Sequence, residues 1–152
     1  MTDNLNLPVV IYISKVGCPA CVGFEKEWSE IKRQLSGKAR TVKFVCDSNL
    51  YPPPCIGKYA GWFPSLICAG PKSYYRIYTP TDQVNQRDYS PDYELKAKKF
   101  NAVEEFDRTT KQTKFTFAGR PNSAQNFVAW FSRLNVADFD ESTPPSSYAN
   151  YF

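Results

Sequence analysis

The chain has 152 residues, a length that fits one domain with a sizeable buried core. Its hydrophobic fraction of 42% and its net charge of +4 are typical of a soluble globular protein. Because the chain contains no histidine, it cannot by itself build a Ser-His-Asp or Cys-His hydrolytic site, or a His-ligated metal site. Its chemistry must come from thiols, carboxylates, lysines or tyrosines.

The charge and hydropathy pattern sets expectations about location and partners. The N-terminal residues show no basic cluster followed by an apolar stretch, and no apolar run approaches the ~20 residues of a membrane helix. We therefore expect a soluble cytoplasmic protein without a membrane partner. A weakly basic body is more often a solvated surface than a nucleic-acid site, so nucleic acid is not an expected partner. In a reducing compartment, five cysteines favour catalytic, metal-binding or buried thiols over a disulfide framework.

The first part of the chain predicts a β-α-β unit. Residues 9–13 form a short apolar run rich in β-branched side chains, which is typical of a strand buried on both faces. Residues 41–46 predict a second strand, parallel to the first through a right-handed crossover. Between them, Pro19 suits the first turn of a helix and Gly37 is placed to end it. Apolar side chains recur at helical spacing at Phe24, Trp28, Ile31 and Leu35.

The pattern weakens after a third predicted strand over residues 64–69. A tyrosine-rich insertion follows over about 71–113, within which residues 94–108 have the composition of a helix. Residues 115–117 predict a further strand. After it, Asn122 or Ser123 can cap a last helix.

These elements predict the α/β class, with a three-layer fold. We expect a central mixed sheet of about four strands flanked by helices, with the insertion before the last strand. A single domain is predicted over 1–139. Residues 140–152 predict an acidic tail that contains proline, serine and aromatic side chains.

The motif Cys18-Pro19-Ala20-Cys21 lies just after the first predicted strand and at the start of a helix. A helix start offers unsatisfied N–H groups and a positive dipole end, which favour a thiolate at Cys18. Lys15 is a nearby cation that adds to this effect. Cys18 is therefore the candidate nucleophile, and Cys21, one turn along the helix, the candidate resolving thiol.

Other interpretations of the cysteines stay open at this point. Two buried structural thiols at a strand–helix junction are one alternative. A zinc site would need Cys46 and Cys55 as further ligands without a second Cys-x-x-Cys, so no metal is expected. Cys46 and Cys55 are either a second disulfide or relay, or two unrelated structural thiols. Cys68 is expected to be a small buried hydrophobic residue.

Residues 9–21 resemble the first strand and active-site turn of glutaredoxins and other proteins of the thioredoxin superfamily. Pro64, preceded by Trp62 and Phe63, sits where the superfamily has its cis-proline, and residues 117–120 resemble the last strand and glycine turn of thioredoxin and protein disulfide isomerase domains. The resemblance covers roughly 9–70 and 115–135. It implies that Pro64 faces the two cysteines and docks substrate backbone, with Trp62 and Phe63 beside it.

The departures from the superfamily bear on the chemistry. Tyr12 occupies the position of the buried acidic proton acceptor of thioredoxins. Lys15 matches the lysine that glutaredoxins use towards the carboxylate of glutathione, which makes glutathione a candidate co-substrate. The Gly-Gly-Asp clamp that binds glutathione is not recognisable after the third strand, and no other cofactor is expected.

Two functions are compatible with these features. The first is a thiol–disulfide oxidoreductase that acts on protein dithiols and disulfides through Cys18 and Cys21. The second is a non-catalytic thioredoxin-fold subunit of a larger assembly, bound to a fixed partner through the 71–113 insertion and the 140–152 tail. The chain is similar to thioredoxin-like proteins of large DNA viruses, so a minor capsid component located in the virion is one form of the second function.

Overall fold

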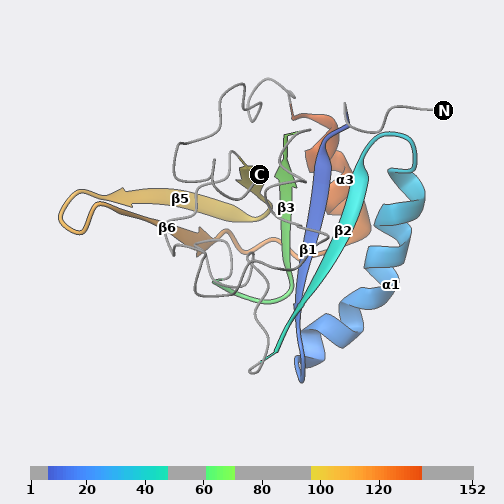
Figure 1. The fold of residues 1–152 in the computed structure, drawn as a ribbon, viewed down its shortest axis with the longest axis horizontal. Helices are drawn as coiled ribbons and strands as arrows, with labels where there is room; N and C mark the ends of the chain where they lie inside the picture. Colours follow the sequence, from blue (N-terminus) through green and yellow to red (C-terminus); the bar gives the residue numbers. More distant parts are fainter. Residues whose placement is uncertain (1–6, 48–60, 71–96, 135–152) are drawn as a thin grey trace, which may run out of the picture.

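The computed structural model describes residues 7–47, 61–70 and 97–134. Figure 1 shows their arrangement as a sheet with two helices beside it and a long hairpin that projects away from it. The elements in chain order are β1 (Val9–Lys15), α1 (Pro19–Gln34), β2 (Arg40–Cys46), β3 (Ser65–Ala69), β4 (Ala97–Lys99), β5 (Ala102–Asp107), β6 (Gln112–Phe117) and α3 (Ala124–Ser132).

The central sheet has four strands in the order β2-β1-β3-β4. Strand β1 pairs in parallel with β2, and Ile11 lies opposite Val42. On its other side β1 runs antiparallel to β3, which in turn runs antiparallel to β4. The predicted β-α-β unit is confirmed, and the mixed four-stranded sheet with helices confirms the predicted α/β class.

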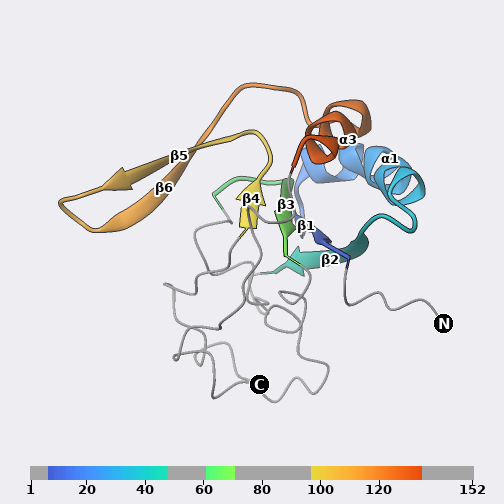
Figure 2. The same ribbon diagram turned by 90° about the horizontal axis from the view of Figure 1, so that it is seen from above.

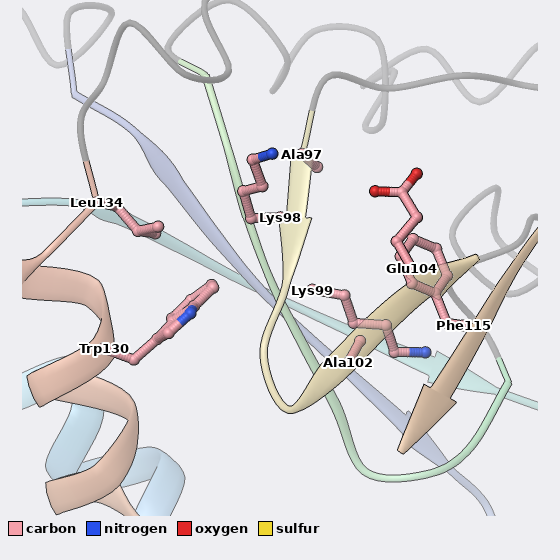
Figure 3. Close-up of a pocket in the computed structure, with 8 residues that line it drawn as sticks. All are labelled: Ala97, Lys98, Lys99, Ala102, Glu104, Phe115, Trp130 and Leu134. Carbon is pink, nitrogen blue, oxygen red and sulfur yellow. The ribbon is translucent and has the colours of Figure 1, made fainter. Parts of the chain in front are cut away.

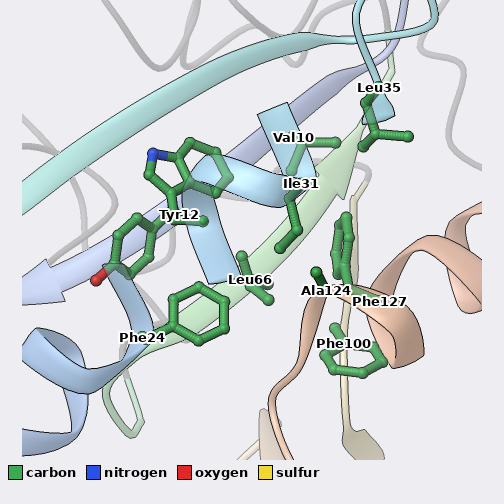
Figure 4. Close-up of a cluster of buried hydrophobic side chains, with 10 residues drawn as sticks. Val10, Tyr12, Phe24, Ile31, Leu35, Leu66, Phe100, Ala124 and Phe127 are labelled. Carbon is green, nitrogen blue, oxygen red and sulfur yellow. The ribbon is translucent and has the colours of Figure 1, made fainter. Parts of the chain in front are cut away.

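Strand β1 is buried on both faces, as its apolar run predicted. Alternate side chains point to opposite faces of a strand, so β1 contributes to two separate clusters. Figure 2 shows α1 and α3 on the same face of the sheet. On that face Val10 and Tyr12 pack with side chains of both helices, as Figure 4 shows. The members of this cluster are Val10, Tyr12, Phe24, Trp28, Ile31, Leu35, Leu66, Phe100, Ala124 and Phe127.

The opposite face of the sheet carries the second apolar cluster. Val9, Ile11 and Ile13 of β1 form its centre and are completely buried. Phe44 of β2 and Ile67 of β3 belong to the same cluster. Burial of such side chains stabilises a fold by about 1.5–3 kcal/mol each relative to exposure, so β1 is the energetic centre of the domain.

Helix α1 begins and ends as its local sequence predicts. Cys18 is the N-cap and Pro19 occupies the first turn, where its missing N–H has no intrahelical partner to lose. Leu35 is the C-cap, and Gly37 follows in the left-handed region at φ 78°. The backbone N–H groups of Lys38 and Ala39 donate to the carbonyl oxygen of Leu35, which satisfies the end of the helix.

The predicted helix over residues 94–108 is wrong, because this segment contains β4 and β5. Phe100 is buried, but Asn101 adopts a left-handed conformation at φ 60° and turns the chain back. The exposed fractions of Val103 and Phe106 are 50% and 62%, so no apolar helix face exists here. Residues 102–107 pair instead with β6 across a short turn, and this pairing overrides the helical composition.

The last strand of the central sheet is also not where the sequence placed it. Residues 115–117 form a strand, but they belong to β6, which pairs only with β5 in a separate two-stranded sheet. The fourth strand of the central sheet is β4, which lies within the range predicted as an insertion. At the tip of the hairpin, Asp107 Oδ1 accepts from the backbone N–H groups of Thr109 and Thr110 and closes the turn.

The predicted domain limits concern segments that the structure describes only in part. Residues 71–96 of the predicted insertion and the whole 140–152 tail lie outside the described residues. Within the described ranges, no helix has the length and apolar character required to cross a membrane.

Candidate redox site

Cys18 lies where the chain leaves β1 and enters α1. Gly17, at φ 79°, makes the turn, and the N–H of Cys18 donates to the carbonyl oxygen of Lys15 at 3.2 Å. As the N-cap, Cys18 directs its sulfur back over the helix, where Sγ accepts from the N–H of Cys21 at 3.2 Å. This N–H and the helix dipole both stabilise negative charge on the sulfur. The half-buried Cys18 side chain is also open to solvent on one side.

Cys21 lies one turn further along α1 and is buried beneath Cys18. The exposed fraction of Cys21 is 2%, whereas Cys18 is half-buried. Both residues are free thiols. Burial, followed by the hydrogen bond with the Cys18 side chain, raises the pKa of the Cys21 thiol. The two cysteines are therefore chemically unequal: one is accessible and one is protected.

Tyr12 fills the place beneath Cys21 where the superfamily has an acid. Its hydroxyl donates to the carbonyl oxygen of Cys21 at 3.3 Å, which ties the first turn of α1 to β1. Its ring packs against Phe24 and Trp28, at centroid distances of 5.2 and 5.1 Å. Burial raises the pKa of Tyr12 to about 12, so its hydroxyl cannot accept a proton from Cys21 at neutral pH.

The loop before β3 lies beside Cys18. The peptide bond between Phe63 and Pro64 is cis, which is the isomer that the superfamily resemblance implied. The thiol of Cys18 points to the carbonyl oxygen of Phe63 at 4.0 Å. The ammonium group of Lys15 lies 5.5 Å from the centroid of the Phe63 ring. The structure thus brings five residues of the predicted site together: Lys15, Cys18, Cys21, Phe63 and Pro64.

Trp62 is positioned by residues that the sequence did not indicate. The ammonium group of Lys99, at the end of β4, lies 3.7 Å from the centroid of the Trp62 ring, and Phe117 contacts the same ring edge-on at 5.5 Å. Burial lowers the pKa of Lys99 to about 8. No sequence signal points to Lys99, because it falls in the segment predicted as a helix, and only the β3–β4 pairing brings it to Trp62.

Lys99 also lines a cavity of about 230 Å³ between β4, the root of the β5–β6 hairpin and the end of α3. Figure 3 shows this cavity with Lys98 and Glu104 at its polar side. The lining residues are Ala97, Lys98, Lys99, Ala102, Glu104, Phe115, Trp130 and Leu134. Cys18 and Cys21 are not part of this lining, so the cavity is separate from the thiol pair.

The other cysteines do not join the Cys18 site. Cys68 is a fully buried free thiol in β3, and burial raises its pKa to about 12, which agrees with the predicted role of a small hydrophobic residue. Cys46 is disulfide-bonded, so neither an unrelated free thiol nor a zinc ligand describes it. Cys55 lies outside the described residues. Within the described ranges, no cluster of three or more His, Cys, Asp or Glu side chains is arranged to hold a metal ion.

The comparisons with known proteins assign no family to the chain. No protein-family model matches the chain, and no curated protein sequence matches it. Among solved structures, the crystal structure of the Trx4 domain of ERdj5 is similar at 17% sequence identity, covering 84% of this chain and 78% of that chain, with a TM-score of 0.42. The assignment rests on topology instead: the β2-β1-β3-β4 order, the strand directions and the position of α1. The fold is thioredoxin-like.

Proposed function

We propose that the chain is a thiol–disulfide oxidoreductase that acts on disulfides of other proteins through Cys18 and Cys21. The observation that carries this proposal is the pairing of an accessible thiol with a buried one at a helix start. Cys18 caps α1 and accepts the N–H of Cys21 at 3.2 Å, while Cys21 is only 2% exposed. Two cysteines with a purely structural role would not require an accessible sulfur. Here Sγ of Cys18 is accessible, accepts a backbone N–H and faces the carbonyl oxygen of Phe63.

The proposed reaction has two exchange steps. The thiolate of Cys18 attacks one sulfur of a substrate disulfide, forms a mixed disulfide with it, and releases the other substrate sulfur as a thiolate. Cys21 then loses its proton and attacks Sγ of Cys18, so that the Cys18–Cys21 disulfide forms and the second substrate sulfur leaves as a thiolate. The substrate is reduced by two electrons and the chain is oxidised. A small thiol such as glutathione or dithiothreitol restores the dithiol, and no resident cofactor takes part.

The surroundings of Cys18 support a polypeptide substrate. The carbonyl oxygen of Phe63 lies 4.0 Å from Sγ of Cys18, where an extended segment can pair with this backbone beside the sulfur. Trp62 and Phe63 supply half-buried aromatic surface on the same loop. Lys15, exposed beside Phe63, provides a positive charge for the thiolates that the reaction generates.

The second step is the slower one in this proposal. Cys21 has a raised pKa, and the Tyr12 hydroxyl beneath it cannot accept its proton. Water or hydroxide must then remove the proton, so release of the substrate accelerates as the pH rises. The mixed disulfide at Cys18 is therefore long-lived at neutral pH.

The test is reduction of insulin disulfides with dithiothreitol as the electron donor. The wild-type chain should accelerate the reaction, Cys18→Ser should abolish the acceleration, and Cys21→Ser should accumulate the mixed disulfide. Cys68→Ser is the matched control, because Cys68 is a buried free thiol outside the site, and it should retain turnover. Equal turnover of Cys18→Ser and the wild type would refute the proposal.

The structural alternative depends on segments that are described only in part. It places the contacts with a fixed partner in the 71–113 insertion and the 140–152 tail, of which 71–96 and 140–152 lie outside the described residues. Cys18→Ser and a deletion of residues 140–152 distinguish the two functions. A structural subunit would show no insulin reduction, and it would lose its partner on deletion of 140–152 but not on Cys18→Ser.

A further inference from the structure

Two asparagine side chains connect the cis-proline loop to the rest of the domain. Nδ2 of Asn122 donates to the carbonyl oxygen of Pro64 at 3.2 Å. Oδ1 of Asn122 accepts from Nδ2 of Asn101 at 3.0 Å, and the same Nδ2 donates to the carbonyl oxygen of Arg120 at 2.7 Å. A continuous chain of hydrogen bonds thus runs from the end of β4 to the loop that faces Cys18.

Asn101 is a fixed anchor for this chain. Its exposed fraction is 7%, and its backbone is held in the left-handed region at φ 60°. Its carbonyl oxygen accepts from the N–H of Ala118 at 2.8 Å, while the neighbouring N–H of Phe100 donates to the carbonyl oxygen of Leu66 at 2.8 Å. The two ends of the β5–β6 hairpin pair next to Asn101, because Ala102 lies opposite Phe117.

Asn122 was predicted only as one of two possible helix caps. The structure assigns the cap to Ser123, whose hydroxyl accepts from the N–H of Asn126 at 3.1 Å. The amide of Asn122 is therefore available for Pro64. Asn126, one turn into α3, makes a different contact: its exposed amide donates to the carbonyl oxygen of Pro121 at 3.1 Å.

The Pro64 carbonyl lies next to the part of the loop that faces Cys18. It belongs to the residue that follows Phe63, whose own carbonyl oxygen lies 4.0 Å from Sγ of Cys18. Pro64 is buried and offers no N–H of its own, so the Asn122 amide is the polar contact that fixes the orientation of this carbonyl. The Asn122 contact therefore fixes the Pro64–Ser65 peptide, and the proline ring, which restricts φ, connects that peptide to the Phe63–Pro64 peptide that faces Cys18.

We propose that Asn122, supported by Asn101, is a positioning residue that holds the Phe63–Pro64 segment in place to bind substrate polypeptide beside Cys18. This inference rests on the proposed oxidoreductase function. It assigns the two asparagines to substrate binding and not to the reactivity of the Cys18 sulfur.

The test uses three variants of the full chain and two readouts. Asn122→Asp keeps the acceptor for Asn101 but faces Pro64 with an oxygen; Asn122→Ala removes the side chain; Asn101→Gly tolerates φ 60° but loses the amide. Each should raise KM for insulin about fivefold, the factor that one neutral hydrogen bond provides. Each should leave the alkylation rate of Cys18 by iodoacetamide, which needs no peptide docking, within about twofold of wild type.

Asn126→Ala is the matched control, and both of its readouts should equal those of the wild type. If the wild type reduces insulin and the folded Asn122→Asp and Asn122→Ala variants have unchanged KM, the inference is overturned while the proposed function stands. Equal changes in KM and in alkylation rate would also overturn it, because they would show a general structural role. If the wild type does not reduce insulin, both the proposed function and this inference fall.

Discussion

Native iodoacetamide labelling should modify Cys18 long before Cys21 and Cys68, the other free thiols among the described residues. The perturbation is a brief exposure of the folded dithiol chain to iodoacetamide at pH 8. Cys18 is half-buried at the surface, whereas Cys21 and Cys68 are 2% and 0% exposed. Since only a thiolate reacts, both ionisation and access set the rate at each position.

The expected protection from labelling is largest for Cys68. With its pKa raised to about 12 by burial, only about one Cys68 side chain in 10,000 is ionised at pH 8. An ordinary exposed thiol, with a pKa of about 8.5, is roughly one quarter ionised at the same pH. Ionisation alone thus slows Cys68 about 2,000-fold, and exclusion of the reagent from the core slows it further. Burial also raises the pKa of Cys21, so Cys21 should also react more slowly with iodoacetamide than Cys18.

The assay is peptide mapping by mass spectrometry at a series of labelling times. When half of the Cys18 peptide is modified, less than about 1% of the Cys68 peptide should be modified, given the ionisation ratio. In guanidinium chloride, where burial is lost, the peptides of Cys18, Cys21 and Cys68 should react at similar rates. Native labelling of Cys68 within tenfold of the rate of Cys18 would refute the reasoning, because it would mean that neither burial nor the raised pKa protects this thiol.

Three further perturbations test the environment of the site. Tyr12→Phe removes the hydroxyl bonded to Cys21 and should lower the free energy of unfolding in urea by about 1 kcal/mol. It should leave kcat for insulin within about twofold, since a Tyr12 hydroxyl with a pKa of about 12 is no base; a tenfold loss would contradict this. Phe127→Ala empties a fully buried position against Phe100 and should cost about 3–5 kcal/mol in the same assay, whereas a cost below about 1 kcal/mol would disprove the packing. Lys99 has a lowered folded pKa, so the unfolded chain binds more protons between pH 8 and 10.5, and this residue should add stability as the pH rises through that window. The gain should be about 1–2 kcal/mol once attraction to Trp62 and solvent screening are allowed for, and Lys99→Met should remove it from the urea-derived stability profile.

Local sequence signals were sufficient for the core of the fold and for the thiol pair. The apolar run of β1 can only be buried on both faces, and the spacing of Trp28 and Ile31 leaves one orientation for α1. Pro19 and the cysteine before it fix where the helix begins, which places Cys18 at its N-cap. These features depend on residues within a few positions of each other, so they could be predicted from the chain alone.

The second half of the chain depended on strand pairing, between distant residues for β3 and β4 and across a short turn for β5 and β6. Residues 94–108 have helical composition, but β4 pairs with β3 and β5 pairs with β6. Hydrogen bonding to those partners outweighs propensities that differ by less than ~1 kcal/mol per residue. For the same reason the sequence assigned the last strand of the sheet to residues 115–117 and not to β4.

The sequence by itself located the two sulfurs of the proposed reaction, Cys18 and Cys21, at the start of a helix that follows a buried strand. Only the tertiary structure decided what surrounds them. The amide of Asn122 bonds to a proline 58 positions away in the chain, and Lys99 reaches Trp62 through the sheet. The disulfide at Cys46 likewise became visible only in the folded chain. Such contacts are set by three-dimensional packing, because a hydrogen bond or a ring contact depends on distances in space that spacing along the chain does not encode.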